Sequence, residues 1–294
     1  MRSNAGRTGR GLALGVMMLA CGSVHAADVV GVAFVHGTGK QTDARTEYWQ
    51  PGIIDTVRAG LPNSSNYTVI NCDFEQYMWK PETAGCLAGQ LTGFIDSRGI
   101  TKLVVITHSN GGNVLRWILS NPTYDSRYPR LIQTISKVTA LAPSSAGTPL
   151  ADAALNGNAF ESSVGWLLGY KSDAVRQQQV SHMATYNAQN LYGTVGRPAL
   201  PRPFRVVVGS DVESAVWDNN SYCGGYAQNV GLEFTQNWLD SCSDGFLECS
   251  SQKAAGTLWF TDKARTKGAE PLSHNQSRRD CFGLGTLLRN DLTL

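Results

Sequence analysis

The sequence has little of what marks a membrane-spanning or nucleic-acid-binding protein. Only 16% of its residues are charged, and 25 lysines and arginines nearly balance 23 acidic residues. Beyond residue 26, no apolar run approaches the roughly 20 residues that a membrane-spanning helix needs. Such a near-neutral balance gives no electrostatic footprint for a nucleic acid or an anionic membrane surface. We therefore expect no nucleic-acid partner.

A repeated Cys-x-x-Cys pair is also absent, which argues against a structural zinc site. Six cysteines follow residue 26, and an even number in an exported chain favours disulfides. Sequence alone cannot choose among the pairings of six cysteines. Cys72 with Cys86 is the best single prediction, because these two lie close together and are separated from the other four.

The first 26 residues have the three parts of a secretory signal peptide. Three arginines lie within the first ten residues, an apolar core spans 12–20, and small residues follow at 24–26. We predict cleavage after Ala26 and a secreted or periplasmic protein, with residues 27–294 forming one domain. An alternative makes Cys21 a lipid-anchored first residue, although Met18 and Leu19 fit such a signal poorly.

Apolar runs alternate with helical patterns along most of the chain. Strands are predicted at 28–35, 68–74, 103–106, 138–143, 204–211 and 257–261, and helices at 47–59, 82–97, 114–119, 175–190 and 275–290. This alternation favours parallel crossovers. We therefore predict an α/β fold with a mostly parallel, doubly wound sheet and helices on both faces.

The alternation breaks down in two places. We place a cap insertion at 150–203 and a second insertion at 212–243, because neither has the strand and helix spacing of the rest. An apolar group at 164–170 of the cap could face an acyl chain, or it could form the buried side of a helix.

Ser109 lies in a turn between a buried strand and a helix, with Gly111 and Gly112 directly after it. Such a turn lifts a serine hydroxyl above the carboxyl edge of the sheet, and it needs small residues two positions before and after the serine. Thr107 meets this demand less well, so we expect a wider or differently packed turn. The alternative is an ordinary turn with an incidental serine, but the flanking strand and helix favour a nucleophile.

A serine nucleophile needs a base, and the base needs an acid that orients it. Of the five histidines, His274 alone follows the last predicted strand on a loop before a helix. The chain order serine, acid, histidine leaves Asp211 and Asp244 as candidates for the acid. Asp211 ends a predicted strand, whereas Asp244 precedes a turn glycine, Gly245.

Four short motifs together resemble the secreted bacterial lipases and esterases of the α/β-hydrolase fold: 36–37, 108–111, 243–245 and His274. The resemblance covers the order of elements across nearly the whole chain after residue 26. It implies Asp244 as the acid, with the backbone N–H groups of Thr38 and Asn110 as the oxyanion hole. The calcium site of that family cannot be matched to aspartates here, so no metal and no cofactor is expected.

These residues predict a secreted serine hydrolase that cleaves carboxylic esters, with acylglycerols as the favoured substrates. The expected partners are a small-molecule or lipid ester and a transient lipid interface, with no stable protein partner. A polyester depolymerase or an acyltransferase would use the same residues, because these enzymes share one chemistry. A non-catalytic binding protein that keeps the fold is a further alternative.

Overall fold

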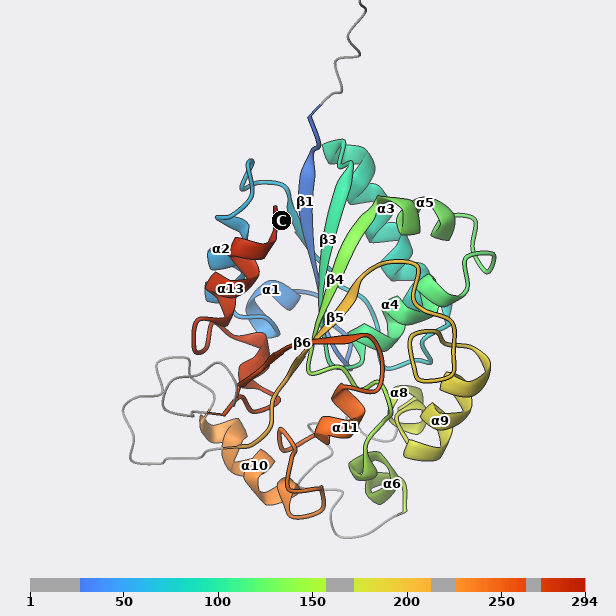
Figure 1. Ribbon diagram of the computed structural model, residues 1–294, viewed down its shortest axis with the longest axis vertical. Helices are drawn as coiled ribbons and strands as arrows, with labels where there is room; N and C mark the ends of the chain where they lie inside the picture. Colours follow the sequence, from blue (N-terminus) through green and yellow to red (C-terminus); the bar gives the residue numbers. More distant parts are fainter. Residues whose placement is uncertain (1–26, 157–171, 213–225, 263–270, 294) are drawn as a thin grey trace, which may run out of the picture.

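The computed structural model describes residues 27–156, 172–212, 226–262 and 271–293. It contains one six-stranded sheet in the order β2-β1-β3-β4-β5-β6, and every pair of neighbouring strands is parallel (Figure 1). The strands are β1 (Val30–Val35), β2 (Tyr67–Val69), β3 (Lys102–His108), β4 (Ile135–Leu141), β5 (Phe204–Val208) and β6 (Thr257–Thr261). The predicted signal peptide and the apolar group at 164–170 lie outside the described residues.

Helices cover both faces of the sheet because alternate strand residues point to opposite sides. Val105 packs into one core with α3 (Cys86–Arg98), α4 (Gly111–Ser120) and α5 (Tyr128–Thr134). Val104 and Ile106 pack into a second core with α2 (Pro51–Arg58) and α13 (Leu284–Asp291). Figure 1 shows these two groups of helices on opposite sides of the sheet. The doubly wound arrangement predicted from the sequence is therefore present.

Several predicted helices are interrupted. The helix expected at 47–59 is two helices, α1 (Ala44–Glu47) and α2, because Gln50 has a φ of 64° and Pro51 then starts α2. The closing helix expected at 275–290 is a 3₁₀ turn, Gln276–Arg278, followed by α13, with Gly283 at a φ of 77° between them. Neither break follows from the apolar spacing on which the predictions were made.

The strand expected at 68–74 is short, because the chain leaves the sheet after β2. Its continuation lies beside the loop after β1, where Gln41 donates a backbone hydrogen bond to Cys72 and Phe74 donates one to Gly39. The predicted Cys72–Cys86 disulfide is confirmed, with Cα atoms 6.0 Å apart. It joins this segment to the start of α3, which a π-helical turn at Pro81–Gly85 precedes.

Five helices lie at the carboxyl end of the strands, in the lower part of Figure 1: α6 (Pro149–Leu155), α8 (Asp173–Gln177), α9 (Val180–Gln189), α10 (Tyr226–Gln236) and α11 (Cys249–Gln252). Side chains of α6, α8 and α10 join Val212, Phe246 and Leu247 in a third apolar cluster. Across the described parts of the chain, no helix has the length and apolar character needed to cross a membrane.

Candidate active site

Ser109 lies at the turn from β3 into α4 in a conformation that residues other than glycine rarely adopt, with a φ of 53°. Gly111 permits this turn, because a Cβ atom there would lie 2.1 Å from the carbonyl oxygen of His36. Thr107 is fully buried beside Gly112, where an added Cβ atom would lie 3.1 Å from the Cβ atom of Pro143 and 3.4 Å from the Thr107 hydroxyl oxygen, so glycine at 112 keeps this part of the turn closely packed. The turn thus keeps the strained serine expected of a nucleophile despite the threonine.

A chain of hydrogen bonds connects Ser109, His274 and Asp244. The Ser109 hydroxyl lies 3.1 Å from Nε2 of His274, and Nδ1 of His274 lies 2.8 Å from Oδ2 of Asp244. An ionised carboxylate can only accept, so Nδ1 carries the proton and Nε2 is free to accept the proton of the serine. This arrangement can remove a proton from serine and hold the resulting imidazolium beside a negative charge.

Asp244 is fully buried, and its carboxylate is held in one orientation. Its Oδ1 atom accepts hydrogen bonds from the backbone N–H groups of Phe246, at 2.9 Å, and Leu247, at 2.6 Å. Its carbonyl oxygen accepts the backbone N–H of His274 at 2.8 Å. The loop therefore fixes both the carboxylate and the start of the histidine segment.

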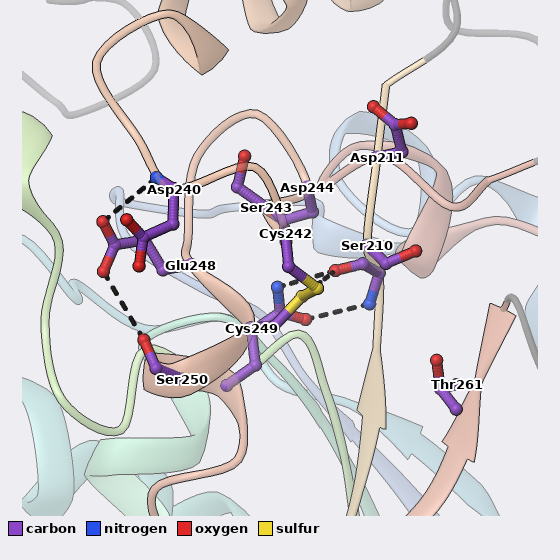
Figure 2. The surroundings of a disulfide bond; sticks show 12 residues. Ser210, Asp211, Asp240, Cys242, Ser243, Asp244, Glu248, Cys249, Ser250 and Thr261 are labelled. Carbon is purple, nitrogen blue, oxygen red and sulfur yellow. Dashed lines mark hydrogen bonds between the residues drawn. A yellow bond between two sulfur atoms is a disulfide. The ribbon is translucent and has the colours of Figure 1, made fainter.

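A disulfide closes this loop. Cys242 and Cys249 are bonded, and Cys249 also donates its backbone N–H to the carbonyl of Cys242 at 2.8 Å, so Asp244 lies in a covalently closed turn (Figure 2). This pairing was not predicted from the sequence.

Asp211, the alternative acid, lies on a different segment near the end of β5 (Figure 2). Its Oδ1 atom accepts hydrogen bonds from the backbone of Val212, at 2.9 Å, and from the side chain of Gln236, at 2.8 Å. The carboxylate that lies against His274 is that of Asp244.

Thr38 and Asn110, the two residues expected to form the oxyanion hole, flank Ser109. Among the described residues, neither backbone N–H has a hydrogen-bond acceptor, and Asn110 is fully buried. Their side chains are held by two adjacent glutamines at the end of α8. Gln178 donates to the Thr38 hydroxyl at 2.9 Å, and Gln177 donates to the Asn110 side-chain oxygen at 3.1 Å.

These glutamines also explain why the helix expected at 175–190 is divided into α8 and α9. The carbonyl oxygen of Gln178 accepts the backbone N–H of Thr148 at 2.9 Å, a tertiary bond that replaces a helical one. No sequence pattern indicated a role for either residue.

His108, next to the nucleophile, binds the backbone of the histidine loop. Its Nε2–H donates to the carbonyl of His274 at 3.0 Å, and the Tyr48 hydroxyl donates to its Nδ1 at 2.5 Å. Burial, reinforced by the nearby His274, holds the pKa of His108 well below its usual value. His108 is therefore neutral at ordinary pH and serves to position its neighbours.

His36 is a second buried, neutral histidine. It accepts the backbone N–H of Cys72 at Nε2, at 3.3 Å, and donates from Nδ1 to the carbonyl of Gly37 at 2.8 Å. Burial lowers the pKa of His36 to about 4. In contrast, His182 is exposed on α9 and bonds the carbonyl of Arg176.

Asp262 is a buried carboxylate that sequence reasoning missed. It follows β6 directly and accepts the backbone N–H of Ser210, at 2.9 Å, and of Leu272, at 2.8 Å. Gly209 allows this approach, because a Cβ atom there would lie 2.2 Å from the carbonyl oxygen of Leu272. Asp262 thus ties the end of β5 to the segment before His274; its position directly after a strand was the available signal.

Ser109 and His274 open into a pocket of about 230 Å³. The rest of its lining is mainly polar or aromatic. It comes from the loop after β1, the end of α1, the end of β3, the Asp244 loop and the segment around His274: Thr38, Gln41, Glu47, Tyr48, His108, Phe246, Asn275 and Arg278. The nucleophile candidate is thus accessible to a small ligand.

No family model and no curated protein matches the chain. Among solved structures, the mature lipase BlEst2 of Bacillus licheniformis is 17% identical with a TM-score of 0.64, covering 90% of this chain and 92% of that one. A metagenomic carboxyl esterase is 15% identical with a TM-score of 0.55, covering 99% and 81%. Lipase 1 from Pelosinus fermentans is 12% identical with a TM-score of 0.52, covering 90% and 99%.

The chain has the α/β-hydrolase fold. The parallel sheet and the flanking helices confirm the fold class predicted from the sequence. Within this α/β-hydrolase fold, Ser109 and His274 both lie at the carboxyl edge of the sheet, on segments that follow β3 and β6.

Proposed function

We propose that this protein is an exported serine hydrolase that cleaves carboxylic esters, with acylglycerols as the favoured class. The observation that carries the proposal is the hydrogen-bond chain from Ser109 through His274 to buried Asp244. The names of structures with the same fold, a carboxyl esterase and several lipases, agree with ester hydrolysis.

In the proposed reaction, the Ser109 oxygen attacks the acyl carbon while Nε2 of His274 takes the serine proton. Asp244 holds the imidazole in the required tautomer and stabilises the imidazolium that forms. His274 then gives the proton to the leaving alkoxide, and the acyl group remains on Ser109. A water molecule, deprotonated by the same histidine, releases the acid and restores the serine.

The backbone N–H groups of Thr38 and Asn110 are the proposed donors to the oxyanion. Both are unpaired among the described residues, so they need not break another bond when charge develops on the carbonyl oxygen. One such donor contributes about 3 kcal/mol to stabilising the transition state. Gln177 and Gln178 hold the side chains of these two residues and thereby position both donors.

Export is proposed from the signal-peptide pattern of residues 1–26 and from the disulfides of the folded chain. Disulfides persist in the oxidising environment outside the cytosol.

The test is to replace Ser109 by Ala and to measure hydrolysis of p-nitrophenyl butyrate. Because the serine is the attacking group, kcat should fall by roughly 10⁴-fold or more. Ser145→Ala is a matched control, since Ser145 is also buried and its hydroxyl has no hydrogen-bond partner in the part of the chain that the structure describes. Circular dichroism should show both variants folded. A folded Ser109→Ala protein with wild-type turnover would refute the proposal.

A further inference from the structure

Arg278 lines the pocket that contains Ser109 and His274. It ends the 3₁₀ turn Gln276–Arg278, four residues after His274, and is partly buried. Its guanidinium lies over the ring of Tyr48, 4.4 Å from the ring centre. A cation is thus fixed beside the proposed nucleophile, in a position that the proposed ester chemistry does not require.

The guanidinium is held in place but not saturated. Nη1 donates to the carbonyl of Tyr48 at 2.9 Å, while Nε and Nη2 donate to the side-chain oxygen of Asn275 at 3.2 and 2.8 Å. Arginine has five N–H donors, so within the described residues these three bonds leave two donors without an acceptor, one on each terminal nitrogen. Two donors on neighbouring nitrogens match the two oxygens of a carboxylate or phosphate.

No carboxylate within the described residues lies within ion-pair distance of Arg278. Glu47 lines the same pocket but is exposed to solvent and makes no ion pair with it. Burial lowers the pKa of Arg278, which indicates that part of its hydration has been lost. A desolvated cation without a counter-ion gains more from an incoming anion than an exposed one does.

We infer that Arg278 binds an anionic group of the substrate, so that among the esters of the proposed class, acylglycerols included, the preferred ones carry a carboxylate or a phosphate close to the scissile bond. The inference rests on the proposed ester hydrolysis and names the substrate class. Because the pocket is only about 230 Å³ in volume, an anion bound to Arg278 would lie within a few bonds of the reacting carbonyl.

The test compares kcat/KM for anionic and neutral esters of similar shape. In one arm, mono-p-nitrophenyl glutarate, with a carboxylate in the acyl part, is compared with p-nitrophenyl butyrate. In the other, 3-(butyryloxy)phenyl phosphate, with a phosphate in the alcohol part, is compared with phenyl butyrate. Hydrogen bonds to charged groups are strong enough that Arg278→Gln should lower the anionic-to-neutral ratio about tenfold or more in one arm.

Arg197→Gln is the matched control. That guanidinium also lies over a tyrosine ring, Tyr192, and is also held by backbone carbonyl oxygens, but it lies outside the pocket. Its ratio should equal that of the wild type. Arg278→Lys keeps the charge but loses the two-pronged geometry, so its ratio should fall between those of the wild type and Arg278→Gln.

If Arg278 had a purely structural role, Arg278→Gln would lower kcat/KM equally for the anionic and the neutral ester. An anionic-to-neutral ratio that is unchanged in both arms would therefore overturn the inference. Should the Arg278 variants not fold, competitive inhibition of the wild type decides. The inhibition constants of benzoate and phenyl phosphate are compared with that of neutral benzamide at constant ionic strength. At least one of the two anions should bind about tenfold more tightly than benzamide. Equal inhibition would overturn the inference. If Ser109→Ala retains turnover, the proposed function fails instead.

Discussion

Replacing Asp244 by Asn tests the proposed base, His274, separately from the proposed nucleophile, Ser109. The variant keeps the shape of the side chain but replaces one carboxylate oxygen with an NH₂ group. Oδ1 of Asp244 accepts two buried backbone N–H groups, from Phe246 and Leu247. Leaving those donors unpaired would cost about 1 to 3 kcal/mol each, so the asparagine oxygen should occupy this position.

The asparagine NH₂ group would then face Nδ1 of His274, at the present 2.8 Å contact. Because that group can only donate, Nδ1 must accept and the imidazole proton moves to Nε2. The histidine would then have no lone pair directed at Ser109. The same change in a serine protease triad lowers kcat about 10⁴-fold, which corresponds to about 5.5 kcal/mol in the activation barrier.

The assay is kcat for p-nitrophenyl butyrate at pH near 8, with circular dichroism and thermal unfolding as controls for folding. Asp211→Asn is the matched variant, because Asp211 bonds only to Val212 and Gln236 among the contacts described above. It should retain kcat within about threefold of the wild type. The reasoning is refuted if folded Asp244→Asn stays within tenfold of the wild type, or if Asp211→Asn is the more damaging change.

Three further predictions concern the surroundings of the site. Burial lowers the pKa of His36 from 6.5 to about 4, so between these values the unfolded chain binds a proton at His36 that the folded chain does not. The contribution of His36 to the free energy of unfolding should therefore fall by about 2 kcal/mol between pH 8 and pH 5. The free energy of unfolding of His36→Asn, from urea titrations at each pH, should lack this part of the pH dependence. A variant with the same pH dependence as the wild type would contradict the prediction. The double variant Cys242→Ser, Cys249→Ser removes the disulfide that closes a short loop. It should lower the free energy of unfolding, measured by urea titration, by about 2.5 kcal/mol. An unchanged free energy of unfolding would show that the bond does not stabilise the folded chain. Gln178→Ala removes the side chain that donates to the Thr38 hydroxyl, and Thr38 is one of the two proposed oxyanion-hole residues. This variant should lower kcat about tenfold with little change in KM, a smaller effect than the loss of an oxyanion donor itself. Its neighbour Gln179 bonds Asp152 instead, so Gln179→Ala should leave kcat unchanged, and equal losses in both variants would count against the positioning role.

The fold could be predicted because strand burial leaves a strong trace in the sequence. The run at 103–106 is apolar on both faces since β3 lies in the middle of a parallel sheet, with β1 and β4 on either side. The turn around Ser109 was also readable, since the close approach of the backbone to His36 demands glycine at 111.

The interruptions of the helices were not predictable in this way. Gln178 takes a conformation that depends on distant partners, Thr148 and Thr38, and these tertiary hydrogen bonds decide it more than local propensity does. The positive φ of Gln50, which separates α1 from α2, has no counterpart in the apolar spacing of the sequence. The choice between Asp211 and Asp244 as the proposed acid was likewise not decided by a local pattern. Asp211 and Asp244 both suited the chain order, and the choice rested on a resemblance until the structure brought the Asp244 carboxylate to His274.

Hydrogen bonds between polar residues that are far apart in the chain left no recognisable pattern in the sequence. Tyr48 and His108 are 60 residues apart and Asn110 and Gln177 are 67 apart, yet each pair is joined by a hydrogen bond at the site. Any polar residue in a loop could have made such a bond. Their roles followed only from the three-dimensional arrangement.

The central claim, that Ser109 is a nucleophile activated by His274, is tested most directly by covalent labelling. The protein is incubated with diethyl p-nitrophenyl phosphate, and intact-mass and peptide mass spectrometry then locate the adduct. We predict one diethylphosphoryl group per chain, on Ser109, formed together with the loss of esterase activity and absent from Ser109→Ala. Labelling at another residue, or full esterase activity in a protein labelled at Ser109, would contradict the account.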